Sequence, residues 1–236
     1  MTNRKLWLCV CVVAALSFTS GAQAGMKILL DLGNSGPDWV SPAPWNNLYC
    51  DIGALAPVGL SVPNCIDSLG NPTGVSITVN DDFGSNNRDG TQAGPYQAFA
   101  TKDSFFGSQA VFGTGANPTG GLLVDGLNPD YTYTFTYFGS RMSAGDNRET
   151  QYQTVGLDSS TVFLNPGDNI SNTVTSAAIT PAANGTIQIN VTYGPNNNNW
   201  AKFFYLGTVE INEIVPEPVT MSLLGLGGLG LLRRRR

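Results

Sequence analysis

Side chains alternate with a period of two residues along several stretches of this chain, and this alternation restricts the fold more than any other feature. From Tyr131 to Tyr137 every second residue is aromatic, and the residues between them are threonines. Apolar and polar side chains also alternate over 75–79 and 187–191. Successive residues of a β-strand point to opposite faces of a sheet, so these stretches predict strands with one buried and one hydrated face.

The order of these stretches predicts the fold class. We expect Lys27–Leu32 to be the first strand and Lys202–Ile211 the last, and no stretch of useful length has a helical period. With 28 glycines and long polar loops, this indicates an all-β fold, an antiparallel, jelly-roll-like β-sandwich. The first and last strands of such sandwiches are often neighbours, which would bring the two ends of the domain together. Along the last strand, one face is expected to carry Phe203, Tyr205, Val209 and Ile211.

Both ends of the chain have the composition of targeting segments. Arg4 and Lys5 precede an apolar stretch over 6–18, and Ala22-Gln23-Ala24 forms a small-residue cleavage site. We therefore predict that residues 1–24 are a signal peptide that signal peptidase removes, and that residues 25–213 form the β-sandwich domain.

At the other end, residues 214–236 combine a breaker, an apolar stretch and a basic end. Val219–Leu232 carries no charge and would make a helix of about 21 Å, shorter than the roughly 30 Å hydrocarbon core of a membrane. The basic end is placed to stop translocation on the cytoplasmic side; it consists of Arg233, Arg234, Arg235 and Arg236. We predict a short, weak membrane anchor, with a permanent transmembrane anchor as the alternative.

This arrangement resembles the PEP-CTERM sorting signal of bacterial envelope proteins. The residues that match its motif are Val215, Pro216, Glu217 and Pro218. The resemblance implies that an exosortase removes the tail after export. The protein would then occupy the inner membrane only transiently and reach the cell envelope, the surface or the extracellular matrix.

Charge and composition exclude several classes of function. Between Gly25 and Val215 the chain carries 16 acidic and 6 basic side chains, and an acidic surface disfavours nucleic acid. The chain has no histidine, the usual general base and commonest metal ligand. A hydrolase would need two carboxylates at a defined separation. Glu149 with Asp146 or Asp158 could be nominated, but no spacing in the sequence favours either pair. We predict that the protein is not an enzyme.

Two cysteines remain beyond the signal peptide, Cys50 and Cys65. An isolated pair in an exported protein predicts a disulfide, which would close a loop of about fifteen residues and contribute roughly 3 kcal/mol. A zinc site is the alternative, but two thiols without a histidine make a poor zinc cage.

A second resemblance covers most of the domain. It rests on 126–131 before the aromatic strand, 138–141 after it, 148–152 at the next strand, and 30–33 and 45–48 near the start. These segments resemble jelly-roll domains related to galactose-binding and malectin-like modules. The resemblance implies a carbohydrate-binding type of fold.

Aromatic side chains in two loops are the candidate sugar-binding residues, because flat rings cover the apolar face of a sugar. They are Trp39, Trp45 and Tyr49 after the first strand and Trp200 before the last. Tryptophans that plug the ends of the core are the alternative.

Charged residues elsewhere are expected to be structural. Arg141, Arg148 and Glu149 predict ion pairs that pin two strand ends. Three carboxylates could bind a structural calcium ion, which is the only cofactor that the sequence suggests. They are Asp81, Asp82 and Asp89. The alternative is that they are ordinary residues of a polar hairpin loop.

Together these features predict a secreted, non-enzymatic envelope or extracellular-matrix protein that associates with polysaccharide. A structural matrix or coat protein without a specific ligand is the first alternative. A carbohydrate-active hydrolase is the second.

Overall fold

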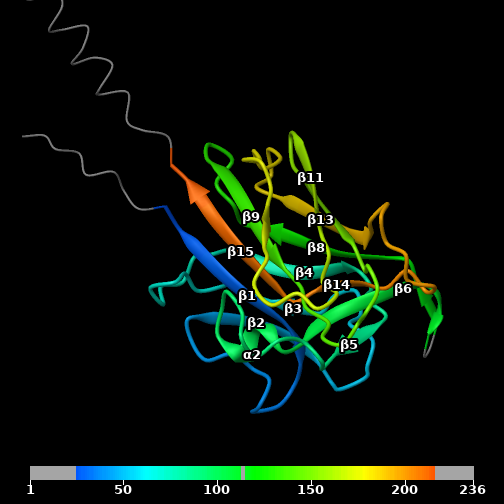
Figure 1. Ribbon diagram of the computed structural model, residues 1–236. Coiled ribbons are helices and arrows are strands. Elements are labelled where there is room, and N and C mark those ends of the chain that lie inside the picture. Colours follow the sequence, from blue (N-terminus) through cyan, green and yellow to red (C-terminus); the bar gives the residue numbers. More distant parts are fainter. Residues whose placement is uncertain (1–24, 113–114, 216–236) are drawn as a thin grey trace, which may run out of the picture. The chain divides into compact units, whose positions relative to one another are not determined.

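The computed structural model describes residues 25–112 and 115–215 (Figure 1). Gly25–Ile214 form one compact unit, built almost entirely of strands. The only helix in the described residues is the single turn α2 (Ala98–Thr101). The all-β prediction is therefore confirmed.

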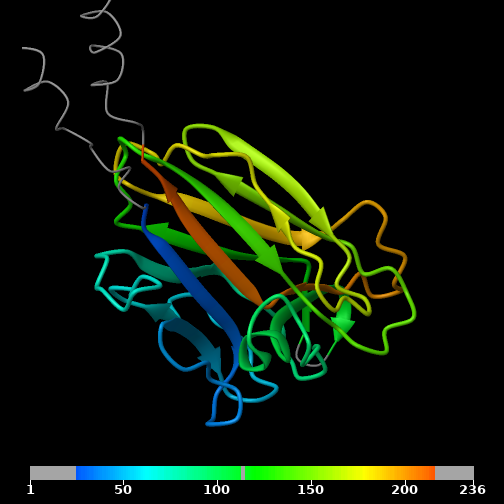
Figure 2. The ribbon, with the colours of Figure 1, turned by 60° about the vertical axis from the view of Figure 1, so that its left-hand side comes forward.

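The first sheet has five strands and contains both ends of the domain. Its order is β12 (Val174–Thr175), β9 (Thr132–Phe138), β15 (Thr208–Ile214), β1 (Lys27–Asn34), β2 (Trp45–Cys50). All its pairs are antiparallel except β1 with β2. β1 and β15 lie side by side (Figures 1 and 2), and the Glu213 amide donates to the Met26 carbonyl at 2.8 Å. The predicted pairing of the first and last strands is confirmed.

The other strands form two further sheets. The six-stranded sheet has the order β11 (Ser159–Leu164), β10 (Thr150–Val155), β13 (Ile187–Tyr193), β8 (Thr119–Asp125), β4 (Ser76–Asp81), β3 (Ser61–Val62). A smaller sheet has the order β14 (Phe204–Leu206), β6 (Ser104–Phe112), β5 (Ser85–Asn87), and β6 also pairs with β7 (Gly115–Asn117). These pairs are all antiparallel.

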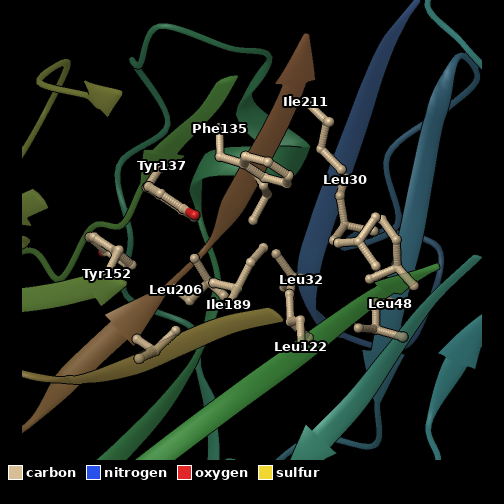
Figure 3. Packing of buried hydrophobic residues seen from close by; sticks show 14 of the residues in the cluster. Leu30, Leu32, Leu48, Leu122, Phe135, Tyr137, Tyr152, Ile189, Leu206 and Ile211 are labelled. Atoms are coloured by element: carbon tan, nitrogen blue, oxygen red, sulfur yellow. The ribbon is translucent and has the colours of Figure 1, made fainter. Parts of the chain in front are cut away.

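The core lies between the five-stranded and six-stranded sheets. Figure 3 shows Leu30 and Phe135 of the first sheet facing Leu122 and Ile189 of the second. All four side chains are fully buried, as the alternation along each strand requires. The two layers make the protein a β-sandwich.

A tyrosine pair joins the two layers. Tyr137 of β9 and Tyr152 of β10 are stacked with ring centroids 4.6 Å apart and planes at 4°. The Tyr137 hydroxyl lies 2.5 Å from the Thr154 hydroxyl, and the Tyr152 hydroxyl donates to the Tyr205 carbonyl at 2.7 Å. Buried phenols need such partners, since an unpaired hydroxyl in a core costs about 1–3 kcal/mol.

The last strand differs from the prediction. Lys202–Ile211 is not one strand, because Gly207 separates β14 in the small sheet from β15 in the five-stranded sheet. The Gly207 amide donates to the Phe138 carbonyl and its carbonyl accepts from Leu32, so the chain changes sheets there. The alternation changes phase at this break: Phe204 and Leu206 share the main core with Val209 and Ile211, whereas Phe203 and Tyr205 form a separate cluster.

The predicted disulfide is wrong: Cys50 and Cys65 are both free. Cys50 ends β2, and its thiol accepts from the Asn86 side chain at 3.2 Å. Cys65 lies in a different hairpin, where its backbone bonds to Val75 and Thr73, and its thiol is directed to the Val62 carbonyl. Burial raises the pKa of the Cys65 thiol to about 11, which keeps it protonated at neutral pH.

Several predicted segments lie outside the described residues. They are the signal peptide over 1–24, the motif residues 216–218, the apolar stretch 219–232 and the arginines 233–236. Within 25–112 and 115–215, no helix has the length and apolar character needed to cross a membrane.

Candidate functional site

A cleft of about 580 Å³ opens beside the small sheet of β5, β6 and β14. Five aromatic side chains from the β1–β2 loop, β6, β14 and the segment before β14 line it: Trp39, Phe106, Phe112, Phe203 and Tyr205. Three arginines from loops after β5 and β9 line it too: Arg88, Arg141 and Arg148. Asp89 lines the cleft as well, so the cleft combines apolar ring surface with an excess of positive over negative side chains.

The rings pack against one another and leave one tryptophan exposed at the edge. Phe203 meets Phe112 edge to face at 5.0 Å and Phe106 at 5.7 Å between ring centroids. Trp200 stands edge to face against Phe203 at 6.4 Å, with 74% of its surface exposed. Aromatic pairs at such distances fix ring orientation, so Trp200 extends the aromatic surface of the cleft outward.

Arg148 is held firmly in the cleft wall. Its Nε contacts Asp146 Oδ1 at 2.7 Å, its Nη1 donates to the Tyr205 hydroxyl at 2.5 Å, and its guanidinium lies over the Phe203 and Tyr205 rings at 5.5 and 5.8 Å. Burial acts to raise the pKa of Asp146, but hydrogen bonds from Asn199 and Arg148 outweigh it, so that pKa is lowered. Burial raises the pKa of Tyr205 although Arg148 opposes it. The carboxylate therefore stays charged and the phenol neutral.

The other two arginines are more open. Arg141 contacts Asp89 Oδ2 at 2.7 Å and donates to the Met142 carbonyl at 3.1 Å. Arg88 is exposed, and within the described residues it has no hydrogen bond or ion pair from its side chain. Half of the six basic residues between Gly25 and Val215 thus line one cleft of an acidic domain.

The structure separates the aromatic residues that the sequence nominated for sugar contact. Trp39 lines the cleft and Trp200 borders it. Trp45 instead packs edge to face on Tyr96 at 5.4 Å, and Tyr49 is half exposed on β2. Sequence reasoning did not nominate Phe106, Phe112 or Arg88, and it assigned Arg141 and Arg148 to ion pairs rather than to this cleft, because strand alternation does not reveal which loops and strands meet.

The predicted ion pairs need a correction. Arg141 and Arg148 are paired, but with Asp89 and Asp146 rather than with Glu149. The Glu149 carboxylate accepts from the Asn196 backbone and side-chain amides at 2.8 and 3.0 Å, because it lies against the loop after β13. Asp158 lies beyond the other end of β10, so it does not form a catalytic pair with Glu149.

The three carboxylates considered for calcium have separate surroundings. Asp82 accepts from the Val58 amide, Asp89 pairs with Arg141, and Asp81 ends β4. In the part of the chain that the structure describes, no group of three or more His, Cys, Asp or Glu side chains could hold a metal ion.

One comparison with known proteins concerns the localisation of this protein. Residues 215–236 match the PEP-CTERM protein-sorting motif. The motif marks an exported bacterial protein that is sorted to the cell envelope or surface through exosortase processing, as the sequence resemblance implied. No curated protein is similar enough to match the chain.

Two plant structures resemble the sandwich at low identity. The ANX2 ectodomain from Arabidopsis thaliana is 14% identical with a TM-score of 0.42, over 82% of this chain and 50% of that one. The ANXUR1 extracellular domain from Arabidopsis thaliana is 12% identical with a TM-score of 0.39, over 81% and 49%. The chain spans about half the length of these structures, and so distant a likeness says nothing about a ligand.

Proposed function

We propose that this exported protein is a non-enzymatic component of the cell surface or extracellular matrix that binds an acidic polysaccharide in the aromatic cleft. The observation that carries the proposal is the gathering of three arginines and five rings in one cleft of an otherwise acidic domain. Sugar rings present apolar faces that stack on aromatic side chains. Carboxylates on a uronic acid polymer would accept hydrogen bonds from guanidinium groups, which match carboxylate geometry in a bidentate manner.

The charge distribution also disfavours other ligands. A neutral glycan would gain hydrogen bonds but no charge attraction from the three arginines, and the remaining acidic surface would repel an anionic polymer that bound anywhere else. Binding should therefore be confined to the cleft and should weaken as salt screens the arginines. A catalytic role lacks support, because the nearest carboxylates, Asp89 and Asp146, are paired with Arg141 and Arg148.

The test compares polymers on residues 25–215, which contain the whole core. We expect retention on alginate or polygalacturonate beads, little retention on dextran, and a loss of binding between about 50 and 500 mM salt. No retention on either acidic polymer would favour a structural matrix or coat protein without a specific ligand. Equal retention on dextran would show that the charge of the arginines does not contribute to binding.

Matched variants locate the binding site. Arg88→Gln removes a cleft charge without breaking a contact that the structure shows, and Trp39→Ala removes a ring of the lining. Both should weaken binding to the acidic polymer. Lys27→Gln is the control, because it removes the same charge on β1, where Lys27 pairs with Glu210. If the control weakens binding as much as Arg88→Gln, the attraction is non-specific and the cleft is not the site.

A further inference from the structure

Two carboxylates are buried beside β1 without the partners that buried charges need. Asp31 is 4% exposed and Asp103 is 1% exposed. Among the described residues, no hydrogen bond of normal geometry reaches either oxygen of Asp31 or Oδ1 of Asp103, although Ser41 lies close enough to lower the pKa of Asp31. No basic side chain forms an ion pair with either carboxylate. Buried carboxylates normally carry hydrogen bonds or a counter-ion, because an isolated buried charge is very costly.

The two carboxylates lie on the same outer face of the five-stranded sheet. Asp31 and Gly33 share that face, since residues two apart in a strand do. A Cβ atom added at Gly33 would collide with the carboxylate of Asp103, so Asp103 lies directly over Gly33. The backbone and side-chain amides of Asn34 hold Asp103 Oδ2 there, at 2.6 and 3.1 Å.

Neutral hydroxyl oxygens from two elements lie on the Asp31 side of this pair, and no hydrogen bond of normal geometry reaches either of them in the described residues. Thr208 is the register partner of Asp31 on β15, so its hydroxyl shares the outer face. Ser41 lies beside Asp31 and is held by two hydrogen bonds to Asn47, the register partner of Asp31 on β2. We call the side-chain oxygens of these residues the buried oxygen cluster: Asp31, Ser41, Asp103 and Thr208.

The electrostatics of the buried oxygen cluster require a cation or a proton. Burial, and then the charge of Asp103, raise the pKa of Asp31 to about 8, although hydrogen bonding from Ser41 acts to lower it. Burial raises the pKa of Asp103 to about 6 against the hydrogen bonds from Asn34. The charge of Lys102 acts to lower the pKa of both carboxylates, but its ammonium lies 4.6 Å from the centres of the Trp39 and Phe99 rings. Neither carboxylate receives it as an ion-pair partner.

We propose that the buried oxygen cluster is a structural calcium site. Two carboxylates and two hydroxyls supply hard oxygen ligands of the kind that calcium prefers. A divalent ion would neutralise both carboxylates and satisfy the unpaired oxygens together. The site contains no nitrogen or sulfur ligand, which disfavours zinc and copper. It differs from the loop of Asp81, Asp82 and Asp89 that the sequence suggested, and it does not depend on the proposed function of the cleft.

The first measurement is thermal unfolding of residues 25–215 in EDTA and in calcium. Calcium at about one hundred times its dissociation constant should raise the Tm by roughly 5–10 °C. Magnesium should give a smaller shift, because it releases its water less readily. No calcium shift would mean that the two carboxylates share a proton instead, and this outcome overturns the proposal. An equal response to magnesium also overturns it.

The second measurement detects occupancy directly. Terbium, which replaces calcium at oxygen sites, should show emission sensitised by Trp45, which lies two residues from Asn47 on the same face of β2. Calcium should displace terbium with a stoichiometry of one per chain. Absence of sensitised emission overturns the assignment of the ion to this face.

One variant distinguishes the loss of ion binding from the loss of the fold. Asp31→Asn removes one buried charge, so its Tm in EDTA should equal or exceed that of the wild type, and its calcium shift and terbium emission should disappear. Asp81→Asn is the matched control, because it removes an exposed carboxylate from the other candidate loop. If Asp81→Asn abolishes the calcium response while Asp31→Asn retains it, the ion binds in that loop and the proposal is overturned.

Discussion

The cleft and the buried oxygen cluster are adjacent. The cleft carries an excess of positive charge at the surface, whereas the cluster contains two carboxylates in the interior. The Asn34 side chain links them, because its Nδ2 donates both to Asp103 Oδ2 at 3.1 Å and to the carbonyl of Asn87, a cleft residue, at 3.2 Å. In the cleft, Arg88 is exposed and Arg141 is partly so. In the cluster, the two carboxylates are almost completely enclosed.

The difference shows how solvation decides what a charge cluster is for. At the surface, the ion pairs with Asp89 and Asp146 and the screening by water and salt limit the repulsion among the three arginines, and Arg88 remains unpaired among the described residues for an external anion. Two carboxylates inside the protein have no such screening, and their repulsion must be neutralised within the fold. The cleft therefore suits a ligand from outside, whereas the cluster suits a resident ion.

The largest effect is expected from a methyl group placed between β1 and Asp103. Gly33→Ala should destabilise the fold by roughly 2–3 kcal/mol, because the new Cβ would collide with the buried carboxylate that Asn34 holds. Urea denaturation measures the change. Gly115→Ala is the control, since a Cβ there meets nothing within 4 Å, and it should change stability by less than about 0.5 kcal/mol. Equal effects would show that Asp103 moves aside easily and that the cluster is not tightly built.

The next effect tests whether the cleft needs guanidinium groups or only charge. Arg148→Lys keeps the charge but loses the stacking on Phe203 and Tyr205, so affinity for an acidic polymer should fall by about tenfold. Arg88→Lys, at an exposed position without such contacts, should stay within about twofold of the wild type. Isothermal titration calorimetry distinguishes them. If Arg148→Lys loses no more affinity than Arg88→Lys, Arg148 acts as a point charge.

Strand alternation predicted the sandwich because it reports which side chains share a face. The pattern over 131–137 became β9, and the pattern over 187–191 became the middle of β13. Alternation does not report whether a face is covered. Asp31, between Leu30 and Leu32, has the pattern of a hydrated residue, but Asp103 and the loop containing Ser41 cover that face.

The candidate sites were harder to predict, because they join segments that are far apart in the sequence. Arg88 follows β5, Arg148 precedes β10, and Tyr205 lies in β14, a strand that exists only because Gly207 breaks the predicted last strand. Trp39 was identified because a tryptophan in a polar loop is conspicuous in any sequence. Arg141 and Arg148 were predicted only as ion-pair residues, which they also are. Arg88, an exposed residue in a polar loop, was not nominated.

A smaller effect is expected where the sandwich core supports the cleft. Tyr152→Phe removes the hydroxyl that donates to the Tyr205 carbonyl, so that carbonyl becomes unsatisfied and stability should fall by about 1 kcal/mol. Chemical denaturation measures it, and the calcium response of the cluster should not change. Tyr137→Phe is a useful comparison, because its hydroxyl meets the Thr154 hydroxyl rather than β14. A larger loss of polymer affinity in Tyr152→Phe than in Tyr137→Phe would show that this bond positions the Tyr205 ring.

The smallest effect concerns a carboxylate on the same sheet face that has its own cation. Glu210 of β15 contacts Lys27 of β1 at 2.8 Å and accepts from Asn212 at 3.0 Å. Burial acts to raise the pKa of Glu210, but these hydrogen bonds outweigh it, so the pKa lies below its usual value. Its ionised form therefore stabilises the fold above the pKa of the unfolded chain, and this contribution is lost as the pH falls through the lower folded value.

Lys27→Met isolates that contribution. At pH 7 the variant should be less stable than the wild type by at most about 1 kcal/mol, because the pair is partly exposed. The difference should close as the pH falls below the folded pKa of Glu210, which urea midpoints measured at several pH values would show. A difference that persists in strong acid would mean that the Lys27 chain stabilises β1 and β15 by packing. Glu210 is therefore the reference for Asp31, which lies two residue pairs farther along the same two strands. With an ammonium group at hydrogen-bond distance, a carboxylate on this face needs no metal ion.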